Sequence, residues 1–137
     1  MKIPCEVVVW QILPLVRREL ARELVSAHGM TQAEVAKRFG VTDAAISQYL
    51  SKKRGGEYSV APMYGQFLDD VKASAARIVD GASDYDSEVC HLCCVTKQNG
   101  LLAYIYREQT GVYPPQCHFD PNQMRSLWYR SSWAYPA

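Results

Sequence analysis

Residues 32–51 read QAEVAKRFGVTDAAISQYLS, and this stretch fits two short helices joined by a tight corner. Three positions support this interpretation. Ala36 is small enough for a close helix crossing, Gly40 can take the positive φ of a tight turn, and Ile46 can wedge one helix against the other. The remaining inward positions are also apolar or aromatic: Val35, Phe39, Val41 and Tyr49. The sequence therefore predicts a helical corner with its own small core.

The second helix of this corner turns small and polar side chains outward, and basic residues follow directly behind it. The outward positions are Thr42, Asp43, Ala44, Ser47, Gln48 and Ser51. Amide and hydroxyl groups can hydrogen-bond to base edges, and alanine can touch a thymine methyl, whereas Asp43 needs a cytosine amino group or an arginine as its partner. The cluster Lys52, Lys53 and Arg54 is suited to phosphate contact, which would make the affinity depend on salt.

The stretch TQAEVAKRFGVTDAAISQYLSKKRG, residues 31–55, resembles the helix-turn-helix of phage-repressor-like (Cro-type) transcriptional regulators. In that family the second helix enters the major groove of DNA. The resemblance therefore implies base contacts from Thr42, Asp43, Ala44, Ser47 and Gln48, and it implies a phosphate contact from Gln32 at the start of the first helix. The alternative is an ordinary helical hairpin, in which Ala36 and Gly40 serve packing alone.

A looser resemblance extends over about the first 95 residues. PCEVVVW, LPLVRRELARELV and the later Cys-x-x-Cys are similar to a group of small prokaryotic predicted regulators. These regulators are expected to carry further cysteines near the segment that here reads GLLAYIY, where this chain has Ala103 and Tyr106.

Composition and charge narrow the class of protein. The chain has 137 residues, of which 48% are hydrophobic, and a net charge of +1. Residues 1–56 hold nine Lys and Arg against five Asp and Glu, whereas residues 57–137 hold six against nine, so the basic excess falls on the half with the corner. No apolar run reaches the roughly 18 residues of a membrane span and no export signal is visible, so we expect a cytoplasmic protein with reduced cysteines.

Helical periodicity extends along most of the chain. Val16, Leu20 and Leu24 predict an amphipathic helix that ends at Gly29, with its charged residues turned away from the core: Arg17, Arg18, Glu19, Arg22 and Glu23. Residues 3–13 fit a strand or the first turns of a helix, and Pro4 favours the helix. Further helices are expected over about 63–80, around Val89 to Asn99, over 101–109 and after Asp120.

The cysteines form a second candidate site. Cys90 and Cys93 have the two-residue gap that lets both thiolates reach one metal, and Cys117 follows 24 residues later. Cys5 is our candidate for the fourth ligand, and Cys94, His91 and His118 stay open as alternatives. Such a set would suit an iron–sulfur cluster or zinc. Buried cysteines need no metal, however, so packing alone also accounts for them.

These observations predict an all-α protein, with a helix-turn-helix domain over residues 1–82 and a cysteine-containing helical region over 83–137, the boundary lying in ASDYDSE. We expect a sequence-specific DNA-binding transcriptional regulator that acts as a homodimer and responds to redox state or metal. We see no catalytic constellation. Two alternatives remain: an iron–sulfur electron carrier or enzyme scaffolded by the helical pair, and a protein-interaction adaptor that has lost DNA binding.

Overall fold

The computed structural model describes residues 3–51 and 57–114, and every regular element within these ranges is helical. The elements are α1 (Pro4–Val7), the π-helical turn η1 (Val8–Ile12), α2 (Leu13–Ser26), α3 (Gln32–Phe39), α4 (Asp43–Leu50), α5 (Tyr64–Val79), α6 (Tyr85–Gln98) and α7 (Leu101–Thr110). The prediction of an all-α fold is confirmed. The predicted basic cluster Lys52, Lys53 and Arg54, as well as Cys117, His118, the helix after Asp120 and the aromatic C-terminal segment, lie outside the described residues.

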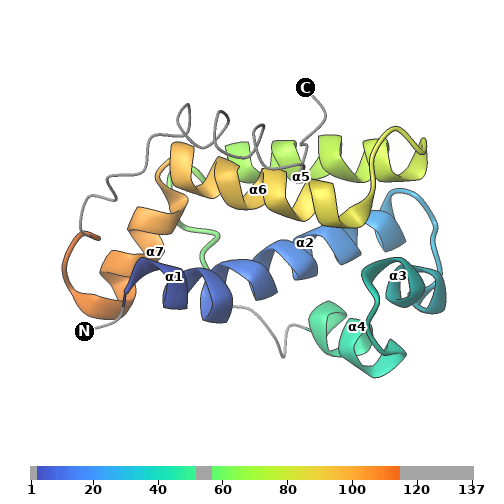
Figure 1. Cartoon of the computed structure of the whole chain (residues 1–137), viewed down its shortest axis with the longest axis horizontal. Helices are drawn as coiled ribbons and strands as arrows, with labels where there is room; N and C mark the ends of the chain where they lie inside the picture. The colour runs from blue at the N-terminus through green and yellow to red at the C-terminus, as the bar shows by residue number, and fades with distance from the viewer. Residues whose placement is uncertain (1–2, 52–56, 115–137) are drawn as a thin grey trace, which may run out of the picture.

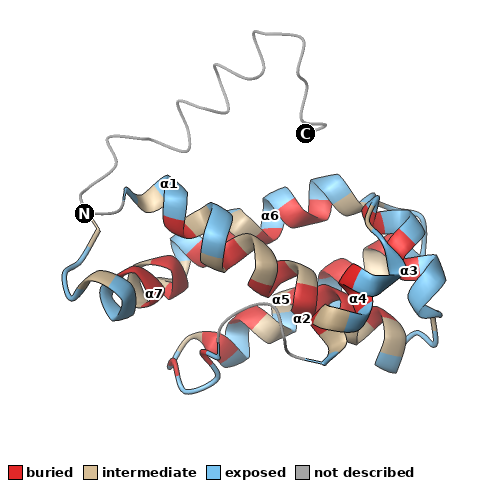
Figure 2. Ribbon diagram, turned by 90° about the horizontal axis from the view of Figure 1, so that it is seen from below, coloured by how far each residue is buried: buried red, intermediate tan, exposed pale blue. Residues whose placement is uncertain are grey.

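The long helix α2 is the centre of the fold. In Figure 1, α5 and α6 run along one side of it, while α3 and α4 lie on the other. Its residues Val16, Leu20 and Leu24 are fully buried, as their four-residue spacing predicts. The buried side of every helix turns toward the interior of this bundle (Figure 2).

Helices α6 and α7 contribute to the same hydrophobic core as α2 through Leu92, Leu101 and Ile105. The described parts of the two predicted regions, 1–82 and 83–137, therefore share one packed interior. The division near residue 82 stays a prediction about the chain. No helix of the described residues is long and apolar enough to cross a membrane.

The N-terminal run is helical throughout, as Pro4 suggested, but it contains one wide turn. Pro14 has no N–H to donate to the carbonyl of Trp10, and its ring would collide with that carbonyl in a regular α-helix. The helix accommodates Pro14 through the π-turn η1, in which the N–H of Leu13 donates to the carbonyl of Val8, five residues back. The extra residue places Ile12 in the core and leaves Val9 and Trp10 exposed.

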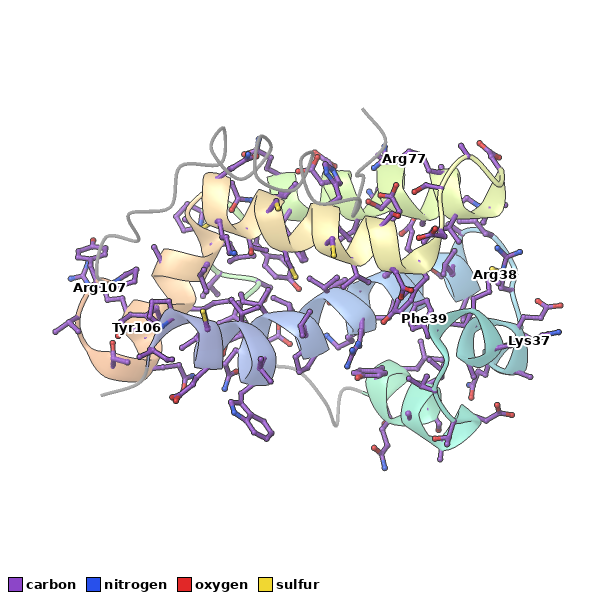
Figure 3. The ribbon with its side chains drawn as sticks, viewed as in Figure 1. Lys37, Arg38, Phe39, Arg77, Tyr106 and Arg107 are labelled. Carbon is purple, nitrogen blue, oxygen red and sulfur yellow. The ribbon has the colours of Figure 1, made fainter. Side chains whose placement is uncertain are left out.

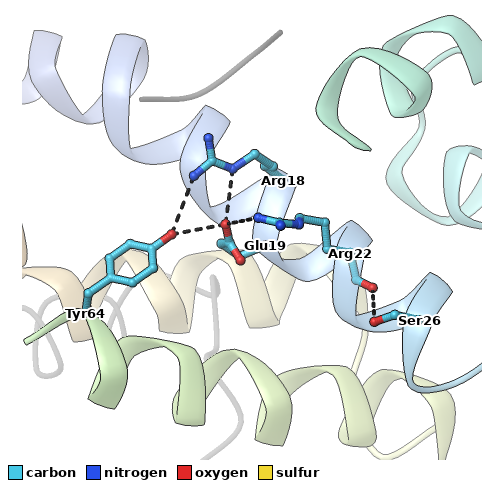
Figure 4. A network of polar contacts seen from close by, with 5 residues as sticks. All are labelled: Arg18, Glu19, Arg22, Ser26 and Tyr64. Atoms are coloured by element: carbon cyan, nitrogen blue, oxygen red, sulfur yellow. Dashed lines mark hydrogen bonds and ion pairs between the residues drawn. The ribbon is translucent and has the colours of Figure 1, made fainter. Parts of the chain in front are cut away.

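Two charged residues of α2 are buried, contrary to the sequence prediction that they turn away from the core. Arg18 is 2% exposed and Glu19 is 8% exposed. Figure 4 shows the reason, which is a network with Tyr64 of α5. The Tyr64 hydroxyl donates to Glu19 Oε1 at 3.0 Å, and the same oxygen accepts from Arg18 and Arg22 at 3.1 Å each. Burial and the charge of Glu19 raise the pKa of Tyr64 to about 12, so this hydroxyl keeps its proton.

The segment ASDYDSE, which we expected to be a boundary, begins helix α6. The Asp84 carboxylate accepts a hydrogen bond from the N–H of Ser87 and caps the helix. Glu88, one turn into α6, is buried and pairs with Arg77 of α5 through bonds of 2.8 and 2.9 Å. Burial alone would raise the pKa of Glu88, but hydrogen bonds from Arg77, Ser74 and Ser83 lower it to about 2.

Candidate nucleic-acid interface

Helices α3 and α4 meet in the corner that the sequence predicts. Helix α3 ends at Phe39 and is capped by Gly40, which has φ 65° and ψ 33°, and α4 begins three residues later at Asp43. Ala36 and Ile46 are buried between the two helices and α2, together with Val35, Phe39 and Tyr49. Val41 is half-buried against the same core. The three positions on which the interpretation depended therefore have the environments it required.

Both helices of the corner are capped at their N-termini. The Thr31 side chain accepts from the N–H of Glu34 at 3.1 Å, and the Glu34 carboxylate accepts from the N–H of Thr31 at 3.0 Å, so the predicted capping box is present. Thr42 caps α4 in the predicted way, because its hydroxyl accepts from the N–H of Ala45 at 3.1 Å. These bonds satisfy amide donors that a helix otherwise leaves without partners.

The outward side of α4 is open in this chain. Thr42, Asp43, Ala44, Ser47 and Ser51 are exposed, and Gln48 is half-buried. We call these six residues the reading ridge. No other described element covers them, so the ridge is accessible to a large ligand. Asp43 lies in the first turn of α4, where a negative charge is favoured by the helix dipole, and this gives the acid a structural role that needs no DNA contact.

Two further exposed residues of α3 belong to the same motif. Gln32 is the first residue of α3, at the helix end where backbone N–H groups favour an anion. Lys37 is exposed, and Figure 3 shows it pointing away from the bundle. Its charge is part of the basic excess of residues 1–56, and sequence reasoning had not singled it out.

Contacts of Phe39, Arg38 and Arg17 support the corner against the rest of the bundle, and sequence reasoning missed them. The Phe39 ring of α3 stacks on the Tyr85 ring of α6, with the ring centroids 4.1 Å apart and the planes inclined by 20°. Arg38 of α3 donates to the carbonyl of Ile78 in α5 at 3.3 Å. Arg17 of α2 donates to the Tyr85 hydroxyl at 3.0 Å and also hydrogen-bonds Tyr49 of α4.

These contacts orient the reading ridge from outside the motif. Tyr85 lies 46 residues beyond Phe39 in the sequence and in another helix. Figure 3 places Phe39 on the side of α3 that faces α6. A tyrosine beside two aspartates gave no sequence signal of this role, because stacking depends on the tertiary arrangement of α3 and α6.

The structure places the three described cysteines of the predicted ligand set on two helices. Cys90 is exposed and Cys93 is half-buried on α6, while Cys5 is exposed on α1. Within residues 3–51 and 57–114, no three His, Cys, Asp or Glu side chains are close enough to hold a metal ion together. Burial, together with the neighbouring thiols of Cys90 and Cys94, raises the pKa of Cys93 to about 11. The described residues thus do not fit a metal site by themselves, and Cys117 and His118 lie outside the described residues.

Comparison with known proteins agrees with the geometry of the corner. No curated protein and no solved structure matches the chain. The helix-turn-helix family model does match, over residues 19–55. The match begins within α2 and runs through α3, Gly40 and α4, which are the elements described above. Residues 19–55 of this chain therefore match a helix-turn-helix family, and the described part of that stretch, residues 19–51, has the helix-turn-helix geometry.

Proposed function

We propose that this protein is a sequence-specific transcriptional regulator whose reading ridge contacts base edges in the major groove of double-stranded DNA. The observation that supports the proposal most directly is the exposure of Thr42, Ala44 and Ser47 on a helix held rigidly by the core. A helix that reads bases must be both accessible and preorganised, because a misplaced hydrogen bond to a base edge no longer distinguishes the correct base pair from the others.

Each side chain of the ridge has a distinct role in this proposal. Gln48 pairs with an adenine edge, and Ser47 and Thr42 donate to or accept from nearby bases. Ala44 contacts a thymine methyl. Asp43 accepts from a cytosine amino group or leaves the contact to its neighbours. Gln32 and the basic residues Lys52, Lys53 and Arg54 bind phosphates and supply affinity that does not depend on sequence.

We also propose that the regulator acts as a homodimer. One helix-turn-helix contacts only about half of a typical operator, and two copies related by a two-fold axis read two half-sites about one helical turn apart. The small size of the reading ridge supports this, because the ridge can specify only a few base pairs in one copy.

The test is selection of bound DNA from a random pool, followed by measurement of affinity for the selected operator and for random DNA. Replacing Ser47 and Gln48 together by Ala should lower the affinity for the operator by about tenfold or more, since each good base contact contributes about 1–3 kcal/mol. The affinity for random DNA should hardly change. Equal affinities for the operator before and after the change would contradict base reading by α4.

Gln66→Ala provides a matched control for this experiment. Gln66 is an exposed polar residue in the first turns of α5, outside the helix-turn-helix. This variant should bind operator and random DNA like the unchanged protein.

The response to redox state or metal is a separate proposal. It rests on the two-residue spacing of Cys90 and Cys93 on one helix, and the further ligands would come from outside the described residues, with Cys117 as our candidate. Anaerobic purification with elemental analysis tests it. About one zinc ion, or the iron and sulfide of one cluster, should accompany each chain, and a stoichiometry near zero would remove the proposal.

A further inference from the structure

A cavity of about 190 Å³ lies between α2 and α5. Its walls carry two acids, two bases and an apolar patch of two side chains: Glu19, Glu23, Arg22, Lys72, Leu68 and Val71. On each of the two helices these residues are spaced by three and four positions, so they lie on one helix face. None of them belongs to the reading ridge, and the cavity is therefore a second candidate site.

Glu19 presents one carboxylate oxygen to this cavity. Its Oε1 accepts hydrogen bonds from Arg18, Arg22 and Tyr64, as Figure 4 shows. Its Oε2 has no hydrogen bond to a described residue, and yet the buried side-chain atom that lacks a partner in the described part of the chain is Asn99 Nδ2. The Oε2 atom is therefore accessible to solvent. Since Glu19 lines the cavity and only 9% of its side chain is exposed, this access is through the cavity.

The other three charged groups at the cavity also have hydrogen-bonding capacity that the protein does not use. Arg22 donates from Nη1 to Glu19 at 3.1 Å, and its side chain is 39% exposed, so most of its five N–H donors stay available. Glu23 is half-buried and Lys72 is exposed, and neither forms an ion pair with another described residue. A half-buried carboxylate without a cation is unfavourable unless water or a ligand solvates it.

We infer that this cavity binds a small zwitterion, an aliphatic α-amino acid, between α2 and α5. Such a molecule carries a carboxylate and an ammonium group on one carbon atom. Arg22 and Lys72 bind the carboxylate, and Glu23 and the Oε2 of Glu19 accept hydrogen bonds from the ammonium group. The apolar patch contacts the aliphatic side chain. The inference goes beyond the proposed reading of DNA and does not depend on it.

The mixture of charges argues against ligands that carry one sign of charge or none. A simple anion would lie beside two carboxylates, and like charges in one site repel each other. A simple cation would meet the two bases in the same way. A neutral apolar ligand would remove water from four charged groups without replacing their hydrogen bonds. A zwitterion is complementary to both signs, so it can replace the lost water at all four groups.

The volume of the cavity limits the size of the ligand. An apolar cavity of about 150 Å³ in a protein can hold benzene, which has six carbon atoms, so about 190 Å³ leaves room for roughly eight non-hydrogen atoms. Valine has this size. Because the binding free energy available per atom is limited, we expect a dissociation constant of about 1 mM for a ligand this small.

The experiment is an NMR titration of the isotope-labelled full chain with L-valine. Concentrations up to about 20 mM should shift the amide signals of residues 19–26 and 68–72 together, with one dissociation constant of about 1 mM. The absence of shifts in these two segments would overturn the inference.

Two analogues of valine test whether both charges are recognised. Isovalerate lacks the ammonium group and isobutylamine lacks the carboxylate, so each leaves charged groups of one sign without a partner. Each should bind at least about tenfold more weakly than L-valine. Isovalerate binding as tightly as L-valine would reduce the cavity to an anion site and would also overturn the inference.

Glu23→Gln and Lys72→Gln test the two walls separately. Each variant should weaken L-valine binding about fivefold, the usual effect of one partly exposed ion pair. Both should keep the helical circular dichroism spectrum, because neither side chain forms an ion pair with another residue of the described ranges. Lys97→Gln on α6 and Glu108→Gln on α7 are matched controls at exposed positions, and they should bind L-valine like the unchanged protein. Unchanged affinity in both folded cavity variants would contradict the site, whatever the protein does with DNA.

Discussion

At the scale of single residues, Gly40 is the position where the helix-turn-helix depends most on backbone freedom. Its φ of 65° is in the left-handed region, and a Cβ added there would meet no atom within 4 Å. The cost of Gly40→Ala is therefore conformational alone, about 1 kcal/mol. We expect the melting temperature to fall by a few degrees, measured by circular dichroism.

Gly65→Ala provides the matched control for that change. Gly65 also has open space around its Cβ position, but it lies in α5 with ordinary helical dihedrals. Alanine is the better helix former, so the stability should stay the same or rise slightly. Equal losses of stability in the two variants would show that the left-handed conformation of Gly40 does not cause the loss in Gly40→Ala.

Glu88 gives a prediction about pH. Its pKa is about 2 in the folded protein and has an ordinary value of 4.5. The folded state therefore binds this proton more weakly than the unfolded state, and the stabilisation is complete above pH 4.5 and disappears as the pH falls toward 2. Glu88→Gln should lower the free energy of unfolding at pH 7 by about 2 kcal/mol, with a smaller difference from the unchanged protein at pH 3.

Chemical denaturation at pH 7 and pH 3 measures this difference. Asp86→Asn is the control, since Asp86 is an exposed acid in the same turn of α6. Its stability should change by less than about 0.5 kcal/mol. A constant effect of Glu88→Gln across this pH range would argue against the ion pair with Arg77.

Residues whose role is set by the nearby chain could be predicted from the sequence, and residues whose role is set by distant partners could not. Ala36, Gly40 and Ile46 act within one corner, so their types and spacing were sufficient. Arg18 and Glu19 are on a helix face that would be solvated without α5. Their burial depends on Tyr64, 46 and 45 residues away.

At the scale of elements, the capping box stabilises the first turn of α3. Thr31→Ala removes the acceptor for the N–H of Glu34 and should cost about 1 kcal/mol of stability. Thr31→Ser keeps the hydroxyl and should preserve most of this stability. Thermal unfolding of both variants checks this, and equal melting temperatures for the alanine and serine variants would contradict the role of the cap.

The element boundaries followed local sequence signals where these were strong. The capping residues located the starts of α3 and α4, and α5 and α7 lie within a residue of their expected limits. The start of α6 was missed by several residues, because Asp84 and Tyr85 read as part of a polar linker. The π-turn was missed as well, because Pro4 favoured helix over residues 3–13 but no sequence signal showed how the helix accommodates Pro14.

At the scale of the whole molecule, Tyr85 couples the helix-turn-helix to the rest of the bundle. Tyr85→Ala removes the stack on Phe39 and the bond from Arg17, and should cost about 2–3 kcal/mol of stability. We also expect severalfold weaker operator binding at a temperature where the variant is fully folded, because α3 and α4 lose a support that fixes their orientation.

Tyr85→Phe separates the ring from the hydroxyl. It keeps the stack and should cost only about 1 kcal/mol, the usual contribution of one hydrogen bond. Its operator affinity, measured by fluorescence anisotropy, should remain close to that of the unchanged protein. Full operator affinity in folded Tyr85→Ala would show that the motif holds its orientation without α6.

The position of α2 has a consequence for engineering. A graft limited to residues 19–55 would start halfway along α2, without Leu15 and Val16 and without the aromatic support of Tyr85. A chimaeric protein that is to carry this DNA specificity would therefore have to include α2 from Leu13 and helices α5 and α6, and the smallest portable unit is most of the bundle.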